Sequence, residues 1–246
     1  MEAIETFRLG LVQTPLVWEE PGANRRHLAK LIAKLEPADL VLLPEMFTTG
    51  FSMQAQNLAE PAGGETLGWL QDQAEQYDCA FSGSVMVKEG EQFFNRLYFV
   101  YPNGDYKQYD KRHLFTLAGE QNVYSGGQER LVVEHKGWRI NPQICYDLRF
   151  PVWCRNTEDF DLQFFVANWP ERRSEAWIAL LKARAIENQC YLAGLNRVGE
   201  DGNGIYHSGD SAVHDPMGKK LSETLPHMET VEVVELEYAH LKRLRA

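Results

Sequence analysis

A four-residue run of aliphatic side chains, Leu40-Val41-Leu42-Leu43, is followed directly by Pro44 and Glu45. A short run in which every side chain is apolar is typical of a β-strand that is covered on both faces, as in a parallel sheet packed between helices. Proline ends such a strand because it cannot donate a hydrogen bond to the ladder. The run therefore predicts an α/β fold in which Glu45 lies at the carboxyl end of a buried strand.

Strand-like and helix-like segments alternate along the rest of the chain. Apolar runs and alternating apolar and polar residues predict strands, whereas apolar residues three and four positions apart predict helices. The predicted strands cover residues 7–11, 40–43, 80–87, 92–101, 106–109, 130–135, 138–145, 162–167, 190–195, 211–214 and 230–236, and the predicted helices cover 67–77, 176–188 and the residues that follow a cap at Asn24. No linker or internal repeat interrupts this pattern, so we expect one domain over residues 1–246 with a mixed sheet or two packed sheets.

The composition narrows the classes of protein. The 246 residues carry 25 Lys and Arg against 35 Asp and Glu, a net charge of −10, so phosphate backbones are repelled and nucleic acid is not an expected partner. No apolar run approaches the roughly 18 residues that a membrane helix needs, and the N-terminus does not resemble a cleaved signal peptide, so no membrane partner is expected. The four cysteines form no CxxC pair. This favours a reducing compartment, and we expect a cytoplasmic enzyme or binding protein.

Three reactive side chains follow predicted strands. Glu45 follows the buried run, Lys111 follows the strand at 106–109, and Cys145 ends the strand at 138–145. In open α/β sheets ligands bind outside the carboxyl ends of the strands, so these ends are candidate site positions. A carboxylate can take the proton of a thiol, and an ammonium can stabilise the oxyanion that forms when sulfur attacks an amide carbon. The three residues therefore form a nucleophilic set that needs no histidine.

The segments around these residues resemble the catalytic motifs of the nitrilase superfamily of carbon–nitrogen hydrolases. The similarity runs in order from Leu9 to Gly218, nearly the whole chain. The matching segments are Leu42-Leu43-Pro44-Glu45-Met46, Asp110-Lys111-Arg112-His113-Leu114-Phe115, Gly119-Glu120, Ile144-Cys145-Tyr146-Asp147-Leu148-Arg149-Phe150-Pro151, Ala167-Asn168-Trp169-Pro170, Ala183-Arg184-Ala185-Ile186-Glu187-Asn188-Gln189 and His207-Ser208-Gly209-Asp210-Ser211. One departure is Pro142 in the approach to the cysteine, which predicts a bulge or a sheet edge there.

The resemblance implies a four-layer α-β-β-α sandwich, paired into homodimers through its outer helices. It also implies an amide or nitrile hydrolase that uses no metal and no organic cofactor. By position, Cys145 is the nucleophile and Glu45 the general base, and Lys111 stabilises the oxyanion together with the backbone N–H of Tyr146. Glu120 then either positions the leaving nitrogen of the substrate or holds Lys111 and water in place.

Within this superfamily the chain resembles the bacterial ω-amidases. These enzymes hydrolyse the terminal amide of 2-oxoglutaramate and 2-oxosuccinamate, which are small-molecule amides that carry a carboxylate. A protein of net charge −10 needs a local cation for such a substrate, and the available choices are Arg149, Arg172 and Arg173. The aromatic residues expected to line the pocket are Phe47, Phe115 and Trp169.

Other interpretations stay open. Related amidases that act on N-carbamoyl amines or deaminated glutathione use the same chemistry, and a catalytically inactive binding protein is the alternative from another class. The presence of Glu45, Lys111 and Cys145 disfavours an inactive protein. A hydrolase of the isochorismatase type also uses an acid, a lysine and a cysteine. It is disfavoured because Lys111 lies 66 positions after Glu45 and because the acid follows a Leu-Leu-Pro strand.

Two further groups of residues have an ordinary explanation. Cys79, Cys154 and Cys190 are expected in the core, because free cysteine is among the most buried residue types. A metal site near the C-terminal end is not expected, since His207 and His214 are separated by an odd number of positions and would face opposite sides of one strand. The residues considered for that site are His207, Asp210, His214 and Asp215.

Overall fold

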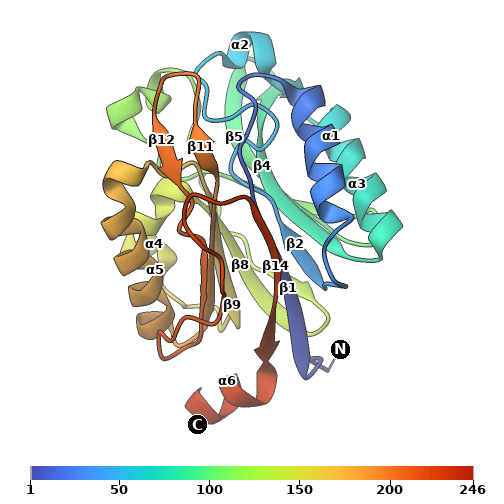
Figure 1. Cartoon of the computed structure of the whole chain (residues 1–246), viewed down its shortest axis with the longest axis vertical. Coiled ribbons are helices and arrows are strands. Elements are labelled where there is room, and N and C mark those ends of the chain that lie inside the picture. Colours follow the sequence, from blue (N-terminus) through green and yellow to red (C-terminus); the bar gives the residue numbers. More distant parts are fainter. Residues whose placement is uncertain (1, 246) are drawn as a thin grey trace.

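The computed structural model describes residues 2–245, in which two β-sheets pack face to face between outer helices (Figure 1). The first sheet has the strand order β14-β1-β2-β4-β5-β6, with β3 beside β4, and the second has the order β13-β10-β9-β8-β7. The predicted α-β-β-α sandwich is thus confirmed. The strands are β1 (Thr6–Gln13), β2 (Leu40–Leu42), β3 (Glu60–Pro61), β4 (Ala80–Glu89), β5 (Gln92–Val100), β6 (Tyr106–Asp110), β7 (Val133–His135), β8 (Trp138–Ile144), β9 (Leu162–Ala167), β10 (Tyr191–Asn196), β11 (Val198–Glu200), β12 (Tyr206–Ser208), β13 (Ala212–His214) and β14 (Thr230–Glu237).

Helices cover the outer face of each sheet (Figure 1). Helices α1 and α3 lie on the first sheet, and α4 and α5 lie on the side of the second sheet. The α-helices are α1 (Pro21–Ile32), α2 (Ala55–Leu58), α3 (Glu65–Tyr77), α4 (Pro151–Cys154), α5 (Ser174–Asn188) and α6 (Tyr238–Arg245), and the 3₁₀ turns are η1 (Thr116–Ala118), η2 (Glu120–Asn122), η3 (Cys145–Arg149) and η4 (Glu171–Arg173). None of the helices in residues 2–245 combines the length and the hydrophobicity that crossing a bilayer requires.

The apolar run at 40–43 forms β2, which lies in parallel between β1 and β4. Leu40 and Leu42 belong to the core shared with the second sheet, whereas Val41 belongs to the core shared with α1 and α3. Successive side chains of a strand point to opposite faces, so a strand covered on both sides has no position for a polar residue. Cys79, Cys154 and Cys190 are all buried, as expected, and Cys154 lies in α4, where its thiol donates to Gln143 Oε1.

Close packing of α5 on the second sheet depends on a residue without a side chain. A Cβ atom at Gly194 in β10 would lie 2.4 Å from the side chain of Leu181 and 2.8 Å from that of Trp177. Both of these side chains are fully buried. Glycine therefore lets the helix approach the strand, and the large residues of α5 fill the space above it.

Parallel pairing brings several strand ends to one edge of the sandwich. Strands β1, β2 and β4 run in parallel, and so do β8, β9 and β10. Strand β6 has the same direction as β4, because both pair antiparallel with β5. In Figure 1, β1 runs from the lower end toward the end where α2, β11 and β12 lie. The residues that follow β2, β6, β8 and β9 are therefore candidates for a common site.

The structure corrects some predicted boundaries. Helix α1 begins at Pro21, and Asn24 lies inside it, where its buried side chain bonds to the backbone of Val17 and Thr48. A tertiary contact therefore explains this asparagine, which is not a cap. The three-residue strands β11 and β12 and the helix α6 were not predicted from the sequence.

The prediction at Pro142 concerned a bulge or an edge, and the structure shows an edge. Strand β8 pairs with β9 over residues 140–144, but β7 pairs only with residues 138–140 of β8. Pro142 thus lies where β8 has a neighbour on one side only. Its missing N–H leaves no donor unpaired there.

Candidate active site

The carboxylates of Glu45 and Glu120 both bond to the ammonium of Lys111 at the edge of the sandwich where the strands end. Lys111, directly after β6, donates from Nζ to Glu45 Oε1 at 2.9 Å and to Glu120 Oε1 and Oε2 at 3.0 and 2.9 Å. All three side chains are completely buried. Charges removed from water are costly unless they are paired. The arrangement satisfies this condition with residues that lie up to 75 positions apart in the sequence.

Two asparagines complete the surroundings of Glu45. Asn95, in β5, donates from Nδ2 to Glu45 Oε1 at 2.8 Å. Asn168, directly after β9, donates its backbone N–H to Glu45 Oε2 at 2.8 Å and its side-chain Nδ2 to the Glu45 carbonyl oxygen. Both oxygens of the carboxylate are therefore oriented by neutral or cationic donors. The sequence similarity had included Asn168 without a role, and Asn95 had not been considered.

Cys145 begins the 3₁₀ turn η3 at the end of β8, and its backbone has a φ of 45°. Positive φ is uncommon for a residue with a side chain and is found mainly where the surrounding structure enforces it. Met46, next to Glu45, has a similar φ of 43°. The chain therefore turns sharply at both strand ends, so that the thiol and the carboxylate face one cavity.

Asp147 fixes the turn that carries Cys145. Its fully buried carboxylate accepts hydrogen bonds from the backbone N–H of Ile144 at 3.2 Å and from the hydroxyl of Tyr109 at 2.8 Å. It also bonds to His113, with the backbone N–H at 2.9 Å and with Nδ1 at 2.8 Å. Tyr109 and His113 lie two positions before and two positions after Lys111. Asp147 thus connects this segment to the cysteine turn, a link that sequence analysis did not identify.

Burial and charge set the protonation of the cluster. Burial raises the pKa of the Cys145 thiol well above its usual value, the Glu45 carboxylate raises it further, and Lys111 partly opposes them. For Lys111, burial lowers the pKa, but Glu120 and Glu45 outweigh burial and raise it above the usual value. Burial also raises the pKa of Glu120, which Lys111 only partly offsets. The free protein therefore holds a neutral thiol beside a cationic lysine.

A cavity of about 400 Å³ opens at this cluster. Its buried end, here called the cavity floor, is formed by Glu45, Lys111 and Cys145. Its outer end, the cavity mouth, carries Arg149, Arg172 and Arg173, and none of them forms an ion pair with an acid of residues 2–245. The complete lining is Glu45, Phe51, Lys111, Phe115, Leu117, Ala118, Cys145, Tyr146, Arg149, Asn168, Trp169, Pro170, Arg172, Arg173, Asp201, Ile205 and His207.

Most of the predicted site residues meet in this cavity, with two differences. Phe47 is fully buried in the core under α3, where its ring lies 5.9 Å from that of Trp69. Gly83 makes room for it, since a Cβ there would lie 2.8 Å from the ring. Phe47 is thus not among the cavity walls, and Phe51 lines the cavity, with Lys111 Nζ 5.1 Å from its ring centroid. Glu120 is the second difference: it lies behind the floor and does not line the cavity.

The residues considered for a metal site lie apart. His207 is in β12 and lines the cavity, whereas His214 is in β13. Burial lowers the pKa of each imidazole to about 4, with the help of Arg197 for His207 and of nearby lysines for His214. Within residues 2–245, no three His, Cys, Asp or Glu side chains are placed to hold a metal ion.

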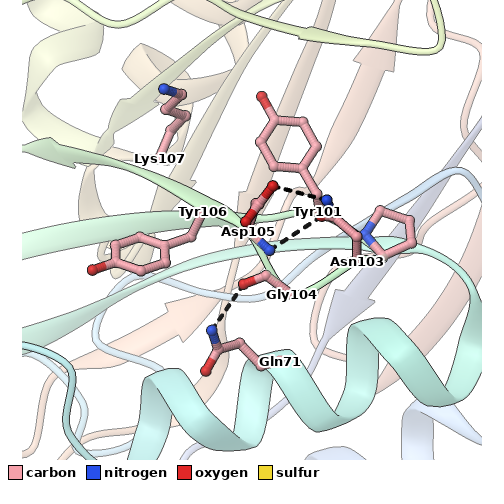
Figure 2. Close-up of a pocket in the computed structure, with 8 residues that line it drawn as sticks. Gln71, Tyr101, Asn103, Gly104, Asp105, Tyr106 and Lys107 are labelled. Carbon is pink, nitrogen blue, oxygen red and sulfur yellow. Dashed lines mark hydrogen bonds between the residues drawn. The ribbon is translucent and has the colours of Figure 1, made fainter.

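A second hollow, of about 760 Å³, lies over the turn between β5 and β6 (Figure 2). Its polar groups mostly bond to one another: Asn103 donates to Asp105 at 2.8 Å, and Gln71 donates to the Gly104 carbonyl oxygen at 2.8 Å (Figure 2). The close-up shows Tyr106 and Lys107 beside this turn. The wall of this hollow, residues 71 and 101–107, contains no cysteine, serine or threonine, and its lysine, Lys107, is exposed. The smaller cavity at Cys145 is therefore the candidate active site.

Comparisons with known proteins agree with this geometry. A family model described as carbon-nitrogen hydrolase matches residues 8–246. The chain belongs to this family. A relative named Omega-amidase YafV, from Yersinia enterocolitica, is 46% identical over 98% of this chain and 94% of its own. A 2-oxoglutaramate amidase from Bacillus subtilis is 34% identical over 88% of this chain and 86% of its own.

The carbon-nitrogen hydrolase assignment extends to the fold. A CN-hydrolase superfamily protein from Xanthomonas campestris, solved with an arsenic adduct in its active site, superposes with a TM-score of 0.96. It is 47% identical, and the match covers 98% of this chain and 94% of that one. The predicted membership of the nitrilase superfamily is therefore confirmed, and the chain is a hydrolase of carbon–nitrogen bonds.

Proposed function

We propose that this carbon-nitrogen hydrolase is an ω-amidase, which converts 2-oxoglutaramate or 2-oxosuccinamate to the 2-oxo dicarboxylic acid and ammonia. The observation that carries the proposal is the single cavity with Glu45, Lys111 and Cys145 at its floor and arginines at its mouth. The relatives named for ω-amidase and 2-oxoglutaramate amidase activity support it over most of the chain.

The first half of the reaction forms a thioester. Glu45 takes the Sγ proton as sulfur attacks the amide carbon, which explains how a thiol with a raised pKa reacts without a standing thiolate. The amide oxygen becomes an oxyanion. An ammonium has three N–H donors: one serves Glu45, a second is shared between the two oxygens of Glu120, and the third is then directed to this oxyanion. The N–H of Tyr146, in the first turn of η3, is the second donor.

The second half releases the products. Glu45 passes its proton to the leaving nitrogen, the carbon–nitrogen bond breaks, and ammonia departs. A water molecule then gives a proton to Glu45 and attacks the thioester carbon. When the carbon–sulfur bond breaks, Cys145 recovers that proton and the free carboxylic acid is released. Glu120 holds Lys111 in place throughout, because both of its oxygens contact Nζ and it does not reach the cavity.

The outer half of the cavity suits a substrate that carries a carboxylate. Arg149 and Arg172 line it and compensate the negative charge that the substrate brings to a protein of net charge −10. The rings of Phe115 and Trp169 line the space between floor and mouth, and the Arg149 guanidinium lies 5.2 Å from the Trp169 ring. A short substrate with an amide at one end and a carboxylate at the other can therefore place the amide at the floor and the carboxylate at the mouth.

We also infer a cytosolic homodimer that associates through α4 and α5. Three apolar side chains on these helices are exposed: Val152 by 89%, Ile178 by 44% and Ile186 by 47%. Exposed apolar side chains grouped on one surface often mark a contact between proteins. Sedimentation of the wild type and of an Ile186→Lys variant tests this inference, since the variant is expected to sediment as a monomer.

Ammonia release across a panel of amides tests the proposed function. The panel contains 2-oxoglutaramate, 2-oxosuccinamate, deaminated glutathione, an N-carbamoyl amine and a simple nitrile. The proposal expects the largest kcat/KM for the two 2-oxo amides. A larger value for deaminated glutathione or the carbamoyl amine would assign the chain to another amidase activity, and no turnover of either 2-oxo amide would contradict the ω-amidase function.

A further inference from the structure

The three arginines at the cavity mouth differ in how firmly the structure holds them. Arg173 is the last residue of η4, and its backbone is bonded on both sides: its N–H donates to the Pro170 carbonyl oxygen at 2.9 Å, and its carbonyl oxygen accepts from Trp169 Nε1 at 2.8 Å. Its side chain is half-buried, whereas Arg149 and Arg172 are exposed. A half-buried side chain on a fixed backbone loses less conformational freedom when a ligand binds.

The Arg173 side chain is also held from the side of the nucleophile. Its guanidinium carbon lies 4.8 Å from the centroid of the Phe115 ring. The Phe115 ring lies 5.0 Å from the ring of Tyr146, the residue after Cys145. The ring of Phe115 thus holds the guanidinium close to the cysteine turn, and a guanidinium can bind a carboxylate with two parallel hydrogen bonds.

No acid among residues 2–245 forms an ion pair with Arg173. Burial lowers the pKa of Arg173, and the neighbouring charges of Arg172 and Arg149 lower it further. Cys145 and Tyr146 are the groups that raise it, which places the guanidinium within electrostatic reach of the reacting sulfur. A half-buried cation crowded by two other cations gains the most from an anionic ligand.

We propose that Arg173 is the specificity-determining residue that binds the carboxylate of the substrate, and that it selects 2-oxo dicarboxylic acid monoamides over neutral amides. The proposal rests on the ω-amidase function given above. Of the other polar groups of the mouth, His207 and Asp201 cannot take this role, and the exposed Arg149 and Arg172 add to the positive charge around it. His207 has a pKa lowered to about 4 by burial and by Arg197, so it is uncharged near neutral pH. Asp201 repels an anion, and its Oδ1 is engaged by the backbone N–H of Asn203 and Ile205.

Steady-state kinetics with two amides of equal length test the assignment. The substrates are 2-oxoglutaramate and pentanamide, which has five carbons and no carboxylate. For Arg173→Gln we expect kcat/KM for 2-oxoglutaramate to fall about 10- to 100-fold, mainly through KM, since a hydrogen-bonded charge pair is lost. The value for pentanamide is expected to change less than about threefold. Arg26→Gln removes one positive charge from the exposed face of α1 and is the control that should leave both substrates unaffected.

Each outcome decides between the two proposals. If the wild type does not prefer 2-oxoglutaramate to pentanamide, the ω-amidase function itself is wrong. If the wild type has this preference and Arg173→Gln keeps it, or if Arg172→Gln or Arg149→Gln reduces it more, the assignment to Arg173 is wrong. Arg173→Lys keeps the charge without the planar fork, and an intermediate loss of preference is expected. Thermal unfolding shows whether each variant is folded, and Arg173→Lys decides the question if Arg173→Gln is not.

Discussion

At the cavity floor every charged side chain contacts a partner of opposite charge, whereas at the mouth the arginines have no acidic partner in the described residues 2–245. Lys111 lies between Glu45 and Glu120, and all three are completely removed from solvent. Arg149 and Arg172 are exposed, and Arg173 is half-buried. At one end of the 400 Å³ cavity the charged side chains are therefore paired with one another, and at the other end the arginines remain unpaired within residues 2–245.

This difference follows from the cost of burying charge. An unpaired charge in the interior is too costly to keep. The charged groups of the floor are therefore paired with one another before substrate binds. At the mouth, water solvates an unpaired arginine at little cost, and a substrate carboxylate can replace that water. The floor is thus preorganised for bond breaking, and the mouth is available for recognition.

The largest expected effect is at the sulfur of the floor. Cys145→Ala and Cys145→Ser are expected to reduce kcat for 2-oxoglutaramate at least about 10⁴-fold, because no other nucleophile lines the floor. The fold should persist, since each change removes at most one buried heavy atom. Thermal unfolding and the inhibition constant of 2-oxoglutarate provide the controls. Turnover within tenfold of the wild type in Cys145→Ala would show that the floor does not act through this thiol.

Loss of the base is expected to be the next largest effect. Glu45→Gln keeps the volume and an acceptor for Asn95, but it cannot take a proton, so kcat should fall about 10²- to 10⁴-fold. Iodoacetamide alkylation of the four thiols, followed by peptide mass spectrometry, is a separate test of whether Cys145 is activated. In the wild type, Cys145 should react before Cys79, Cys154 and Cys190, because it lines the cavity beside a base, whereas the other three are buried and do not line it. Uniform slow alkylation of all four thiols would show that the Cys145 thiol is not activated.

A smaller effect is expected from the residue that aligns the floor. Asp147→Asn weakens the link between the Cys145 turn and the segment of Lys111, so kcat should fall about 10- to 100-fold with KM changed less than about threefold. Asp161→Asn is the matched control: this buried aspartate also accepts a backbone N–H and an arginine, but far from the cavity. If both variants lose stability and neither loses kcat, Asp147 has a structural role only.

The smallest expected effect concerns pH at the mouth. The pKa of His207 is lowered to about 4 by burial and by Arg197, so its imidazole is already uncharged at pH 5.5 and cannot lose a positive charge as the pH rises. The arginines remain charged over the same range. KM for 2-oxoglutaramate should therefore vary less than about twofold between pH 5.5 and 8. A KM that rises tenfold across this range, and no longer does so in His207→Gln, would show that an imidazolium binds the carboxylate.

The sequence predicted the residues of the cavity floor but not the residues that hold them in place. Glu45 and Cys145 were predicted because each follows an apolar strand, and Lys111 because it follows a polar one. Asn95 lies in the middle of β5, where its direction depends on the pairing with β4, which the sequence does not specify. Phe47 was expected near Glu45 because it is close in the chain. The positive φ of Met46 turns the backbone between them, so the ring enters the core instead.

The same limits apply to the fold. Elements with a long apolar period, such as α3, α5 and the strands of the two sheets, were predicted within a few residues. The hairpin of β11 and β12 has three residues in each strand, too few for alternation to be recognised. It nevertheless brings His207 to the cavity. Arg184 is another contact that local patterns do not reveal, since it donates from α5 to the Leu148 carbonyl oxygen in the cysteine turn.

The most direct test of the account is the mass of the enzyme during turnover. Wild-type protein is mixed with 2-oxoglutaramate, quenched in acid within milliseconds to seconds, digested and analysed by mass spectrometry. A thioester mechanism predicts a 2-oxoglutaryl group, lost on treatment with hydroxylamine, on the peptide that contains Cys145. An acyl group on another residue, or full ammonia release without any acyl-enzyme and with Cys145→Ala still active, would contradict it.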